Sequence, residues 1–363
     1  MRVLSLDGGG IRGLIQILII EKMLELANDK FENLFDYVIG TSIGGIMGAA
    51  LTVSNDNGNA KYSAHDVFKM FTDNAELIFP KDHCHAWILE ECLYRSKYKR
   101  DSLDKFLEEK LGDSTFLDTV LPFATLSYSM ELDEPRIWST CRAQQDKSLN
   151  YKLKDATGAT SAAPTYFPVK HTIHNNKNMY DVDGGIFANA PIIEAMADYK
   201  QCSGMEKIRV EDVIIISIGT GKFLREKKII SDTNLDYGIV EWLKDEDLVN
   251  RIMLGTQLDA VESASKLFRV SRINPDLDAK FAPIDKIDKE YLVEFEATIR
   301  NYINQHLGFL QIIVDCLQTK DHSFASLMNN DAHPCGDIIY NDNVLQNLLS
   351  HSQFNTNSVS EDL

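Results

Sequence analysis

The sequence predicts an α/β fold with a mostly parallel central sheet and a helical C-terminal portion. Short apolar segments with the pattern of buried strands alternate with longer segments whose apolar residues recur at helical spacing. Glycine-rich turns follow several of the predicted strands, as expected where a strand turns directly into the next helix. The 363 residues, 44% of them hydrophobic, are enough for one large domain with a sizeable core.

The N-terminal segment contains this alternation in its clearest form. Residues 2–6 are an apolar strand that runs into Asp7 and three glycines. Residues 14–29 then place apolar side chains on one helix face and Glu, Lys and Asn on the other. A second strand at 35–40 leads through a tight turn into a helix of small residues at 43–54. This order predicts parallel strands joined by crossover helices.

The rest of the chain continues the alternation less regularly. Ser63 is a good N-cap for a helix at 63–79, and Gly112 ends a helix at 101–113. From about 235 to 318 the pattern is mostly helical. The other predicted elements are strands at 122–130, 135–140, 178–191 and 211–221 and a helix of small residues at 156–169.

Two parts of the chain differ in composition. We find no internal repeat and no clear linker in 1–318, which favours a single catalytic domain there. Residues 319–363 are rich in Asn, Ser, His and Asp. They predict a C-terminal extension whose last dozen or so residues are disordered.

Charge and hydropathy exclude several classes of function. A net charge of −17 repels nucleic acid and gives no long-range attraction to anionic membranes. We find no secretory signal, and no apolar run approaches the roughly 18–20 residues of a membrane span. These observations predict a cytoplasmic protein, peripheral at membranes at most.

The cysteines predict reduced thiols rather than a disulfide framework, because they are scattered and form no CxxC pair. The cluster His83-Cys84-His85, with Cys92 beyond, is too crowded for the usual zinc-ligand spacing, so we expect no metal site. The six cysteines are Cys84, Cys92, Cys141, Cys202, Cys316 and Cys335.

The stretch "YVIGTSIGGIM" contains a candidate nucleophile. Gly40-Thr41-Ser42-Ile43-Gly44 matches G-x-S-x-G, with an apolar strand before it and a helix after it. In this context Gly40 and Gly44 let the strand and helix approach closely around a strained turn, which exposes the serine hydroxyl at the sheet edge. The alternative is an ordinary tight turn in which Ser42 only caps the following helix.

A serine hydroxyl needs a base, and no histidine is well placed for that role. None of the nine follows a buried strand into a glycine turn, and His171 and His174 fall in a polar loop. Asp183, in "YDVDGGIFANAP", stands at a strand end before Gly184-Gly185, and burial would make it a stronger base. Two alternatives are open: Asp183 only starts a turn, or Asp181, on the same strand face, is the base.

The stretch "DGGGIRG" predicts an oxyanion hole. Gly8, Gly9 and Gly10 have no side chains to cover their N–H groups, and these groups lie at the N-terminus of the next helix. Arg12, followed by Gly13, adds a fixed positive charge that supports the loop or contacts a phosphate.

Together these segments resemble the patatin-like phospholipases. The motifs "DGGGIRG" (7–13), "GTSIGG" (40–45) and "DGG" (183–185) occur in the family's order. Supporting stretches, which extend the resemblance to about residue 310, are "ELIFP" (76–80), "EEKLGD" (108–113), "ATSAAPTYFPV" (159–169) and "SIGTG" (217–221).

The resemblance implies a three-layer α/β/α sandwich and a lipid acyl hydrolase of the phospholipase A or lysophospholipase type. It implies a Ser42–Asp183 dyad without histidine, with Gly8, Gly9 and Gly10 as oxyanion donors and no metal or cofactor. The substrate would be a phospholipid or another acyl lipid; the resemblance does not indicate the head group.

Two other functions are compatible with parts of the sequence. The glycine loop also suits a nucleotide- or phosphate-binding protein, although that would not explain Ser42 and Asp183. A catalytically inactive lipid-binding module is the second. Residues 85–100, where Trp87 and nearby aliphatic residues precede a basic cluster, are the candidate membrane contact; an ordinary core helix with a charged end is the alternative.

Overall fold

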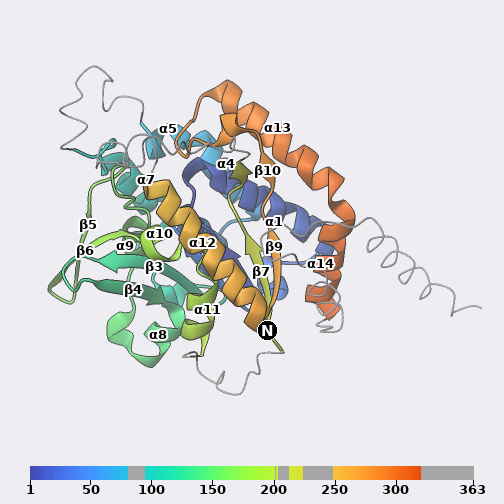
Figure 1. The fold of residues 1–363 in the computed structure, drawn as a ribbon. Helices are drawn as coiled ribbons and strands as arrows, with labels where there is room; N and C mark the ends of the chain where they lie inside the picture. The colour runs from blue at the N-terminus through green and yellow to red at the C-terminus, as the bar shows by residue number, and fades with distance from the viewer. Residues whose placement is uncertain (81–94, 201, 203–211, 224–247, 320–363) are drawn as a thin grey trace, which may run out of the picture.

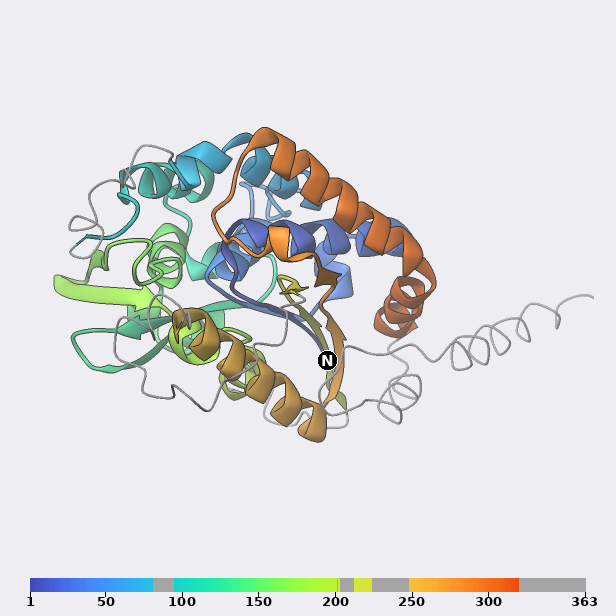
Figure 2. The ribbon, with the colours of Figure 1, turned by 45° about the horizontal axis from the view of Figure 1, so that its top comes forward.

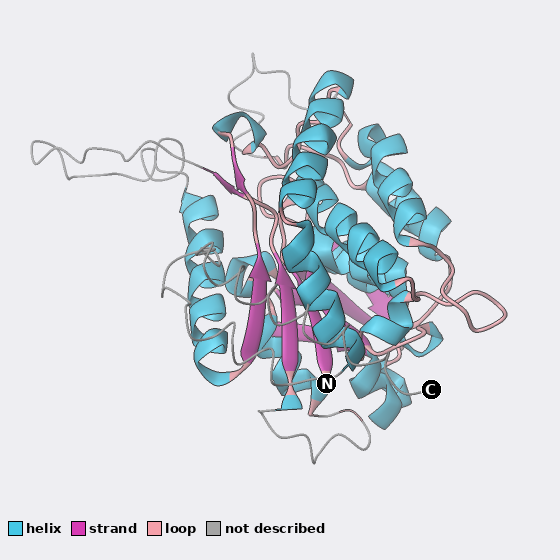
Figure 3. Ribbon diagram, turned by 90° about the vertical axis from the view of Figure 1, so that its right-hand side faces the viewer, coloured by secondary structure: helices cyan, strands magenta, loops and turns pink. Residues whose placement is uncertain are grey.

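The computed structural model describes residues 1–80, 95–200, 202, 212–223 and 248–319, and the fold is given for these residues. They form a central sheet between two layers of helices (Figure 1). Figure 2 shows α12 on one face of the sheet and α1 and α13 on the other. In Figure 3 the strands run side by side with helices on both sides of them. The predicted α/β/α architecture is therefore confirmed.

The main sheet has eight strands in the order β5-β6-β3-β2-β1-β7-β9, with β4 also paired to β3. The five strands from β3 to β9 are mutually parallel, whereas β4, β5 and β6 are joined by antiparallel pairings. The strands are β1 (Arg2–Leu6), β2 (Tyr37–Thr41), β3 (Phe123–Ser129), β4 (Glu134–Ser139), β5 (Lys170–His174), β6 (Lys177–Asp183), β7 (Ile214–Ile218) and β9 (Arg269–Ile273); β8 (Lys222–Phe223) and β10 (Asp276–Leu277) form a separate pair.

Two hydrophobic cores, one on each face of the sheet, hold the layers together. Leu4 and Leu6 of β1 pack into the larger core with α1, α3, α4, α13 and α14. Val3, whose side chain points to the opposite face of β1, packs into the smaller core with α11 and part of α12. This alternation is the period of two that a strand buried on both faces must have.

The α-helices vary in length from single turns to the twenty residues of α12. They are α1 (Leu14–Ala27), α2 (Phe31–Leu34), α3 (Ile43–Thr52), α4 (Ala64–Asp73), α5 (Ala75–Ile78), α7 (Asp101–Leu111), α8 (Thr140–Gln145), α9 (Leu153–Thr160), α10 (Gly185–Ala188), α11 (Ile192–Tyr199), α12 (Leu248–Leu267), α13 (Lys289–Gln305) and α14 (Leu307–Thr319). Short 3-10 turns occupy Gly10–Gly13, Phe116–Asp118, Lys147–Leu149 and Ala279–Phe281.

Two predicted helices have different bounds in the structure. The helix expected at 63–79 divides at Asn74 into α4 and α5, and Ser63 caps α4 through a reciprocal hydrogen bond with Asp66. The helix expected at 156–169 begins and ends earlier, as α9. Two prolines, at 164 and 168, follow it and prevent its continuation.

Two strands of the main sheet lie where the sequence did not predict them. The segment expected to be a polar loop contains β5, which pairs with β6 at one edge of the sheet. The segment expected to be mostly helical contains β9, which pairs with β7 at the opposite edge. Edge strands bury few side chains, so neither β5 nor β9 has the apolar run that identifies a strand in sequence.

The prediction of reduced cysteines is wrong for one pair. Cys141, in α8, is disulfide-bonded to Cys202, just after α11, with the two Cα atoms 4.4 Å apart. They are separated by 61 residues in the chain and meet because α8 packs against α11. Cys316 lies buried in α14. The other three cysteines, with the His83–Cys84–His85 cluster, lie outside the described residues.

The candidate membrane segment at 85–100 is described only from Arg95 onward. Arg100 is buried and bonds to Asp104 and to the Gly158 carbonyl, so it cannot face a bilayer. Lys97 forms an ion pair with Asp285. The membrane role of this segment stays a prediction, as does disorder in the last dozen or so residues of the C-terminal extension, which lie outside the described residues. Within the described parts of the chain, no helix has both the length and the apolar character needed to cross a membrane.

Candidate active site

The pairing of the strands brings the three predicted motifs to one edge of the sheet. Gly8, just after β1, lies against Ser42, just after β2: a methyl group on Gly8 would lie 3.1 Å from Ser42 Cβ. On the other side of β2, Leu126 of β3 pairs with the last residue of β2, and the next residue, Ser127, pairs with Asp183. Because β4 pairs along the opposite side of β3, β6 continues the line of β2, and Ser42 and Asp183 lie next to each other on the same side of β3.

Ser42 occupies a strained turn between β2 and α3. Its φ of 56° and ψ of −125° lie outside the regions that side-chain-bearing residues usually adopt. A Cβ on Gly44 would lie 2.4 Å from the Leu6 carbonyl oxygen, so only glycine permits this close approach of helix and strand. Ser42 makes no side-chain capping bond to α3, which removes the alternative that it serves as a helix cap.

The backbone of Ser42 is held from α9. Its N–H donates to Thr160 Oγ1 over 2.9 Å inside the protein. Two residues further on, the Ala162 carbonyl accepts from the N–H of Asp183 over 3.0 Å. The segment 160–162 thus bonds to the backbones of both predicted members of the dyad and fixes their positions relative to each other.

Asp183 is a buried carboxyl group at the end of β6, with an exposed fraction of 2%. Its Oδ1 accepts from the Gly185 N–H at 2.7 Å, whereas Oδ2 has no hydrogen-bond partner among the described residues. Burial raises the pKa of Asp183 to about 7; the nearby Ser42 hydroxyl and the Gly185 amide oppose the shift. An aspartate with this pKa is an effective proton acceptor near neutral pH.

Asp181, the alternative base, bonds to different residues from those that contact Asp183. Its Oδ1 accepts from Ser127 Oγ over 2.7 Å, and its Oδ2 accepts from Arg136 Nη1 over 3.2 Å. Burial raises the pKa of Asp181 to about 6 although the bond to Ser127 and the charge of Arg136 oppose it. Both its oxygens are occupied, so the geometry favours Asp183 as the base.

The three glycines of the loop differ in what their amides contact. The Gly8 N–H donates to the Asn189 carbonyl over 3.0 Å and is engaged. No bond from the N–H of Gly9 or Gly10 is found to any described residue. Gly10 has a φ of 60°, and a Cβ there would lie 2.1 Å from the Ile284 carbonyl oxygen, so this position requires glycine.

The start of the loop is fixed by the fully buried Asp7. Arg272 of β9 binds both carboxylate oxygens, Nη1 to Oδ1 at 3.0 Å and Nη2 to Oδ2, and Gln257 of α12 donates to Oδ2 at 2.7 Å. Burial raises the pKa of Asp7, and the Arg272 guanidinium opposes that shift. A two-point guanidinium contact of this kind sets the direction in which the loop leaves β1.

Arg12 and Gly13 support the loop from its far side. Arg12 Nε donates to the Gly9 carbonyl at 3.2 Å and Nη1 to the Ala282 carbonyl at 3.1 Å, and the guanidinium stacks 4.7 Å from the Phe223 ring centre. A Cβ on Gly13 would lie 2.6 Å from Ile43, so this glycine lets the first helix pack on α3. At the base turn, Gly184 packs on Leu126 in the same way.

The described histidines take no part in this site. Each bonds elsewhere, to Glu21, Asn178, the Ser148 carbonyl or the Tyr302 carbonyl; they are His65, His171, His174 and His306. Among the described residues, no group of three His, Cys, Asp or Glu side chains is arranged to hold a metal ion.

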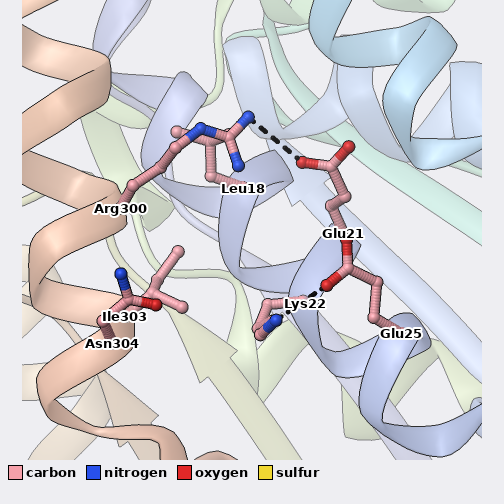
Figure 4. A pocket seen from close by; sticks show the side chains of 7 residues that line it. All are labelled: Leu18, Glu21, Lys22, Glu25, Arg300, Ile303 and Asn304. Atoms are coloured by element: carbon pink, nitrogen blue, oxygen red, sulfur yellow. Dashed lines mark hydrogen bonds and ion pairs between the residues drawn. The ribbon is translucent and has the colours of Figure 1, made fainter.

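A surface hollow of about 240 Å³ lies between α1 and α13 (Figure 4). Its charged groups are paired with one another: Arg300 contacts Glu21, and Lys22 contacts Glu25. None of its lining residues belongs to the site formed by Ser42 and Asp183. The hollow is therefore separate from the candidate active site.

Sequence reasoning missed the residues that hold the site together. Each contacts a motif from a distant part of the chain, and no local pattern marks it for this role. Thr160 lies within the stretch 159–169 used for the family resemblance, and Asn189 lies within "YDVDGGIFANAP", which was considered only for Asp183. The missed residues are Thr160, Asn189, Gln257 and Arg272.

Comparisons with known proteins identify relatives in plants. The model of the patatin-like phospholipase family matches residues 4–196. The chain is 34% identical over 261 residues to Patatin-like protein 4 and 33% identical over 271 residues to Patatin-like protein 1, both of Arabidopsis thaliana. These matches cover 66% and 67% of this chain, which spans 64% of the length of each relative.

Two further similarities complete the comparison. Probable inactive patatin-3-Kuras 1 of Solanum tuberosum is 27% identical over 296 residues, which is 74% of this chain and 77% of that protein. Among solved structures, VipD from Legionella pneumophila aligns over 99% of this chain and 81% of its own, with 13% identity and a TM-score of 0.38. The family model covers more than half of the chain and includes all three motifs of the site. The chain belongs to the patatin-like phospholipase family.

Proposed function

We propose that this protein is a serine lipid acyl hydrolase that cleaves fatty-acyl esters through Ser42 and Asp183. The observation that carries the proposal is the pairing of a strained serine with a buried aspartate whose pKa is raised to about 7. Membership of the family supports lipid hydrolysis in general. It does not decide activity by itself, because one similar protein is named as probably inactive.

The first step forms an acyl-enzyme. Ser42 Oγ attacks the ester carbonyl carbon while Asp183 Oδ2 takes the hydroxyl proton. The carbonyl electron pair moves onto oxygen, where the N–H groups of Gly9 and Gly10 stabilise it; one such donor contributes roughly 3 kcal/mol in related chemistry. Collapse of this intermediate breaks the bond to the lysolipid or alcohol, which leaves with the proton from Asp183.

The second step releases the fatty acid. Water attacks the acyl carbon and gives one proton to Asp183, and the carbonyl electron pair again moves onto oxygen. When the intermediate collapses, the bond to Ser42 Oγ breaks and Ser42 recovers its proton from Asp183. A two-residue dyad suffices because the same carboxylate accepts a proton in one half of each step and returns it in the other.

The test compares fatty-acid release by the wild type and by Ser42→Ala from a phospholipid, a lysophospholipid and a short-chain p-nitrophenyl ester. We expect Ser42→Ala to lose at least about 10³-fold in kcat on every substrate that the wild type cleaves. Ser5→Ala is the matched control: it removes a buried serine oxygen of β1 that bonds to no described residue. Full activity of Ser42→Ala would contradict the proposal, and the substrate panel identifies the acyl lipid preferred.

A further inference from the structure

Two buried oxygen atoms near the Asp183-Gly184-Gly185 turn can accept hydrogen bonds. Neither of them receives a hydrogen bond from any described residue. One is Asp183 Oδ2 and the other is the side-chain oxygen Oδ1 of Asn189, whose exposed fraction is 4%. Native proteins leave few buried polar atoms without partners, and those at a reactive site usually have a partner during the reaction. The two acceptors flank the short helix α10: Asp183 ends β6 just before it, and Asn189 follows its last residue.

The position of Asn189 Oδ1 is bounded by the glycines around it. A methyl group on Gly8 would lie 2.4 Å from this oxygen and 3.1 Å from Ser42 Cβ. A methyl group on Gly185 would lie 3.2 Å from the same oxygen and 3.1 Å from Asp183 Oδ1. The Asn189 oxygen therefore lies close to both Ser42 and Asp183, on the side of the turn that faces the glycine loop.

A chain of hydrogen bonds determines which end of the Asn189 amide faces this site. Asp7, bound on both oxygens by Arg272, accepts from Gln257, so the Gln257 NH2 must point toward Asp7. The Gln257 oxygen is then left to accept from Asn189 Nδ2, at 3.5 Å. Because an amide has its donor and acceptor at opposite ends, the Asn189 oxygen is directed at the dyad.

We propose that Asn189 positions the water molecule that hydrolyses the acyl-enzyme. The inference rests on the proposed function. One O–H of the water donates to Asp183 Oδ2, which takes that proton as the water oxygen bonds to the acyl carbon. The other O–H donates to Asn189 Oδ1 and stays on the new carboxylic acid. The carbonyl electron pair moves to the oxyanion and returns as the Ser42 Oγ–carbon bond breaks, and Ser42 takes the proton back from Asp183.

The proposal distinguishes water from alcohols as acyl acceptors. Water has two O–H groups and can satisfy both oxygens at once, whereas methanol has one and would place its methyl group against Asn189 Oδ1. An oxygen acceptor at this position therefore favours hydrolysis over methanolysis. Replacing it with an apolar group removes that advantage while leaving the proton transfer to Asp183 in place.

The experiment measures free acid and methyl ester formed from a short-chain p-nitrophenyl ester in the presence of methanol. For Asn189→Leu we expect the ratio of methyl ester to acid to rise about three- to tenfold, the effect of one lost hydrogen bond. The rate at which a fluorophosphonate labels Ser42, which requires no water, should stay within about threefold of wild type. Asn178→Leu, an exposed asparagine on β6, is the matched control and should change neither quantity.

Two outcomes would overturn the proposal. One is an unchanged product ratio in folded Asn189→Leu; the other is a parallel fall in labelling and hydrolysis, which indicates a structural role only. If Asn189→Leu fails to fold, Gln257→Met frees the Asn189 amide to rotate and should raise the ratio about twofold, and no rise there also overturns it. A wild type that neither hydrolyses esters nor becomes labelled contradicts the proposed function instead.

Discussion

Asp181 and Asp183 stand two residues apart on the same face of β6, yet their surroundings differ completely. Asp181 is part of a closed polar cluster in which Ser127 and Arg136 occupy its two oxygens, and Trp138 in turn donates to Ser127. Asp183 faces no cation and keeps one oxygen without a partner among the described residues. Burial is therefore common to both carboxyl groups and does not by itself favour either as the proposed base. The two residues differ in whether a carboxylate oxygen is left to accept a proton: Asp183 has such an oxygen, and both oxygens of Asp181 are hydrogen-bonded.

Exchanging each carboxylate for an amide gives the largest contrast. Asp183→Asn removes the proposed base, so we expect kcat to fall at least about 10³-fold with no loss of thermal stability, because a buried unpaired charge is also removed. Asp181→Asn turns an NH2 group toward Arg136, so two donors face each other. We expect about 1–3 kcal/mol lower stability but kcat within about threefold of wild type. Ester hydrolysis and chemical denaturation of both variants test this, and a reversal of the two patterns would assign the base to Asp181.

The pH dependence separates the same two groups. With a pKa near 7, Asp183 must lose its proton to act, so kcat/KM should rise about fiftyfold between pH 5 and pH 7 and roughly a hundredfold to its plateau above pH 8. Stability should change in the opposite direction. The folded-state pKa lies above the ordinary value of 3.8, so its contribution is complete below about pH 4 and is lost as the pH rises to about 7.

Asp181 contributes to stability in the same direction, but its contribution is lost by about pH 6. We therefore expect the free energy of unfolding, measured from pH 4 to pH 8, to fall over different pH ranges in the variants. The decrease near pH 7 should be missing in Asp183→Asn, and the decrease near pH 6 should be missing in Asp181→Asn. A pH–rate profile that is flat across this range would contradict the proposed role of Asp183.

Removing the cation of the Asp181 cluster tests whether an unpaired aspartate is sufficient for chemistry. Arg136→Met leaves Asp181 buried without its charge partner, so we expect roughly 2–4 kcal/mol lower stability at pH 8. The loss should be smaller at pH 5, where Asp181 carries a proton. The double variant Arg136→Met, Asp183→Asn should stay inactive, because Asp181 does not adjoin Ser42. Recovery of hydrolysis in that double variant would contradict this expectation. It would show that an unpaired Asp181 can replace Asp183 as the base despite its different position on β6.

The smallest expected effect concerns the support from α9. Thr160→Val removes the oxygen that accepts from the Ser42 N–H and leaves that buried donor without a partner. We expect kcat to fall about tenfold and stability by about 1–2 kcal/mol. Thr157→Val is the matched control, since Thr157 Oγ1 donates to the carbonyls of Leu153 and Lys154 in its own helix. Equal losses of kcat in both variants would indicate a general effect of α9 rather than a specific one on Ser42.

The sequence by itself determined the features that depend on local chain geometry. The elbow at Ser42 and the "DGGG" and "DGG" turns require glycine where backbone approaches backbone, and that requirement is visible in the residue order. The central parallel strands were predictable because both of their faces are buried and their sequences are largely apolar. The family and the layer arrangement followed from the same segments.

Only the tertiary structure decided which residues complete the site. The edge strands β5 and β9 and the bond between Cys141 and Cys202 depend on pairing across the fold, which leaves no mark on nearby residues. The same is true of the contacts that orient Asn189. Asp181 and Asp183 share one strand face, and in sequence only the position of Asp183 before the glycines separates them; their electrostatic surroundings differ because Arg136 of β4 forms an ion pair with Asp181. Electrostatic surroundings are a property of distant segments brought together, so the contacts that favour Asp183 as the proposed base are visible only in the fold.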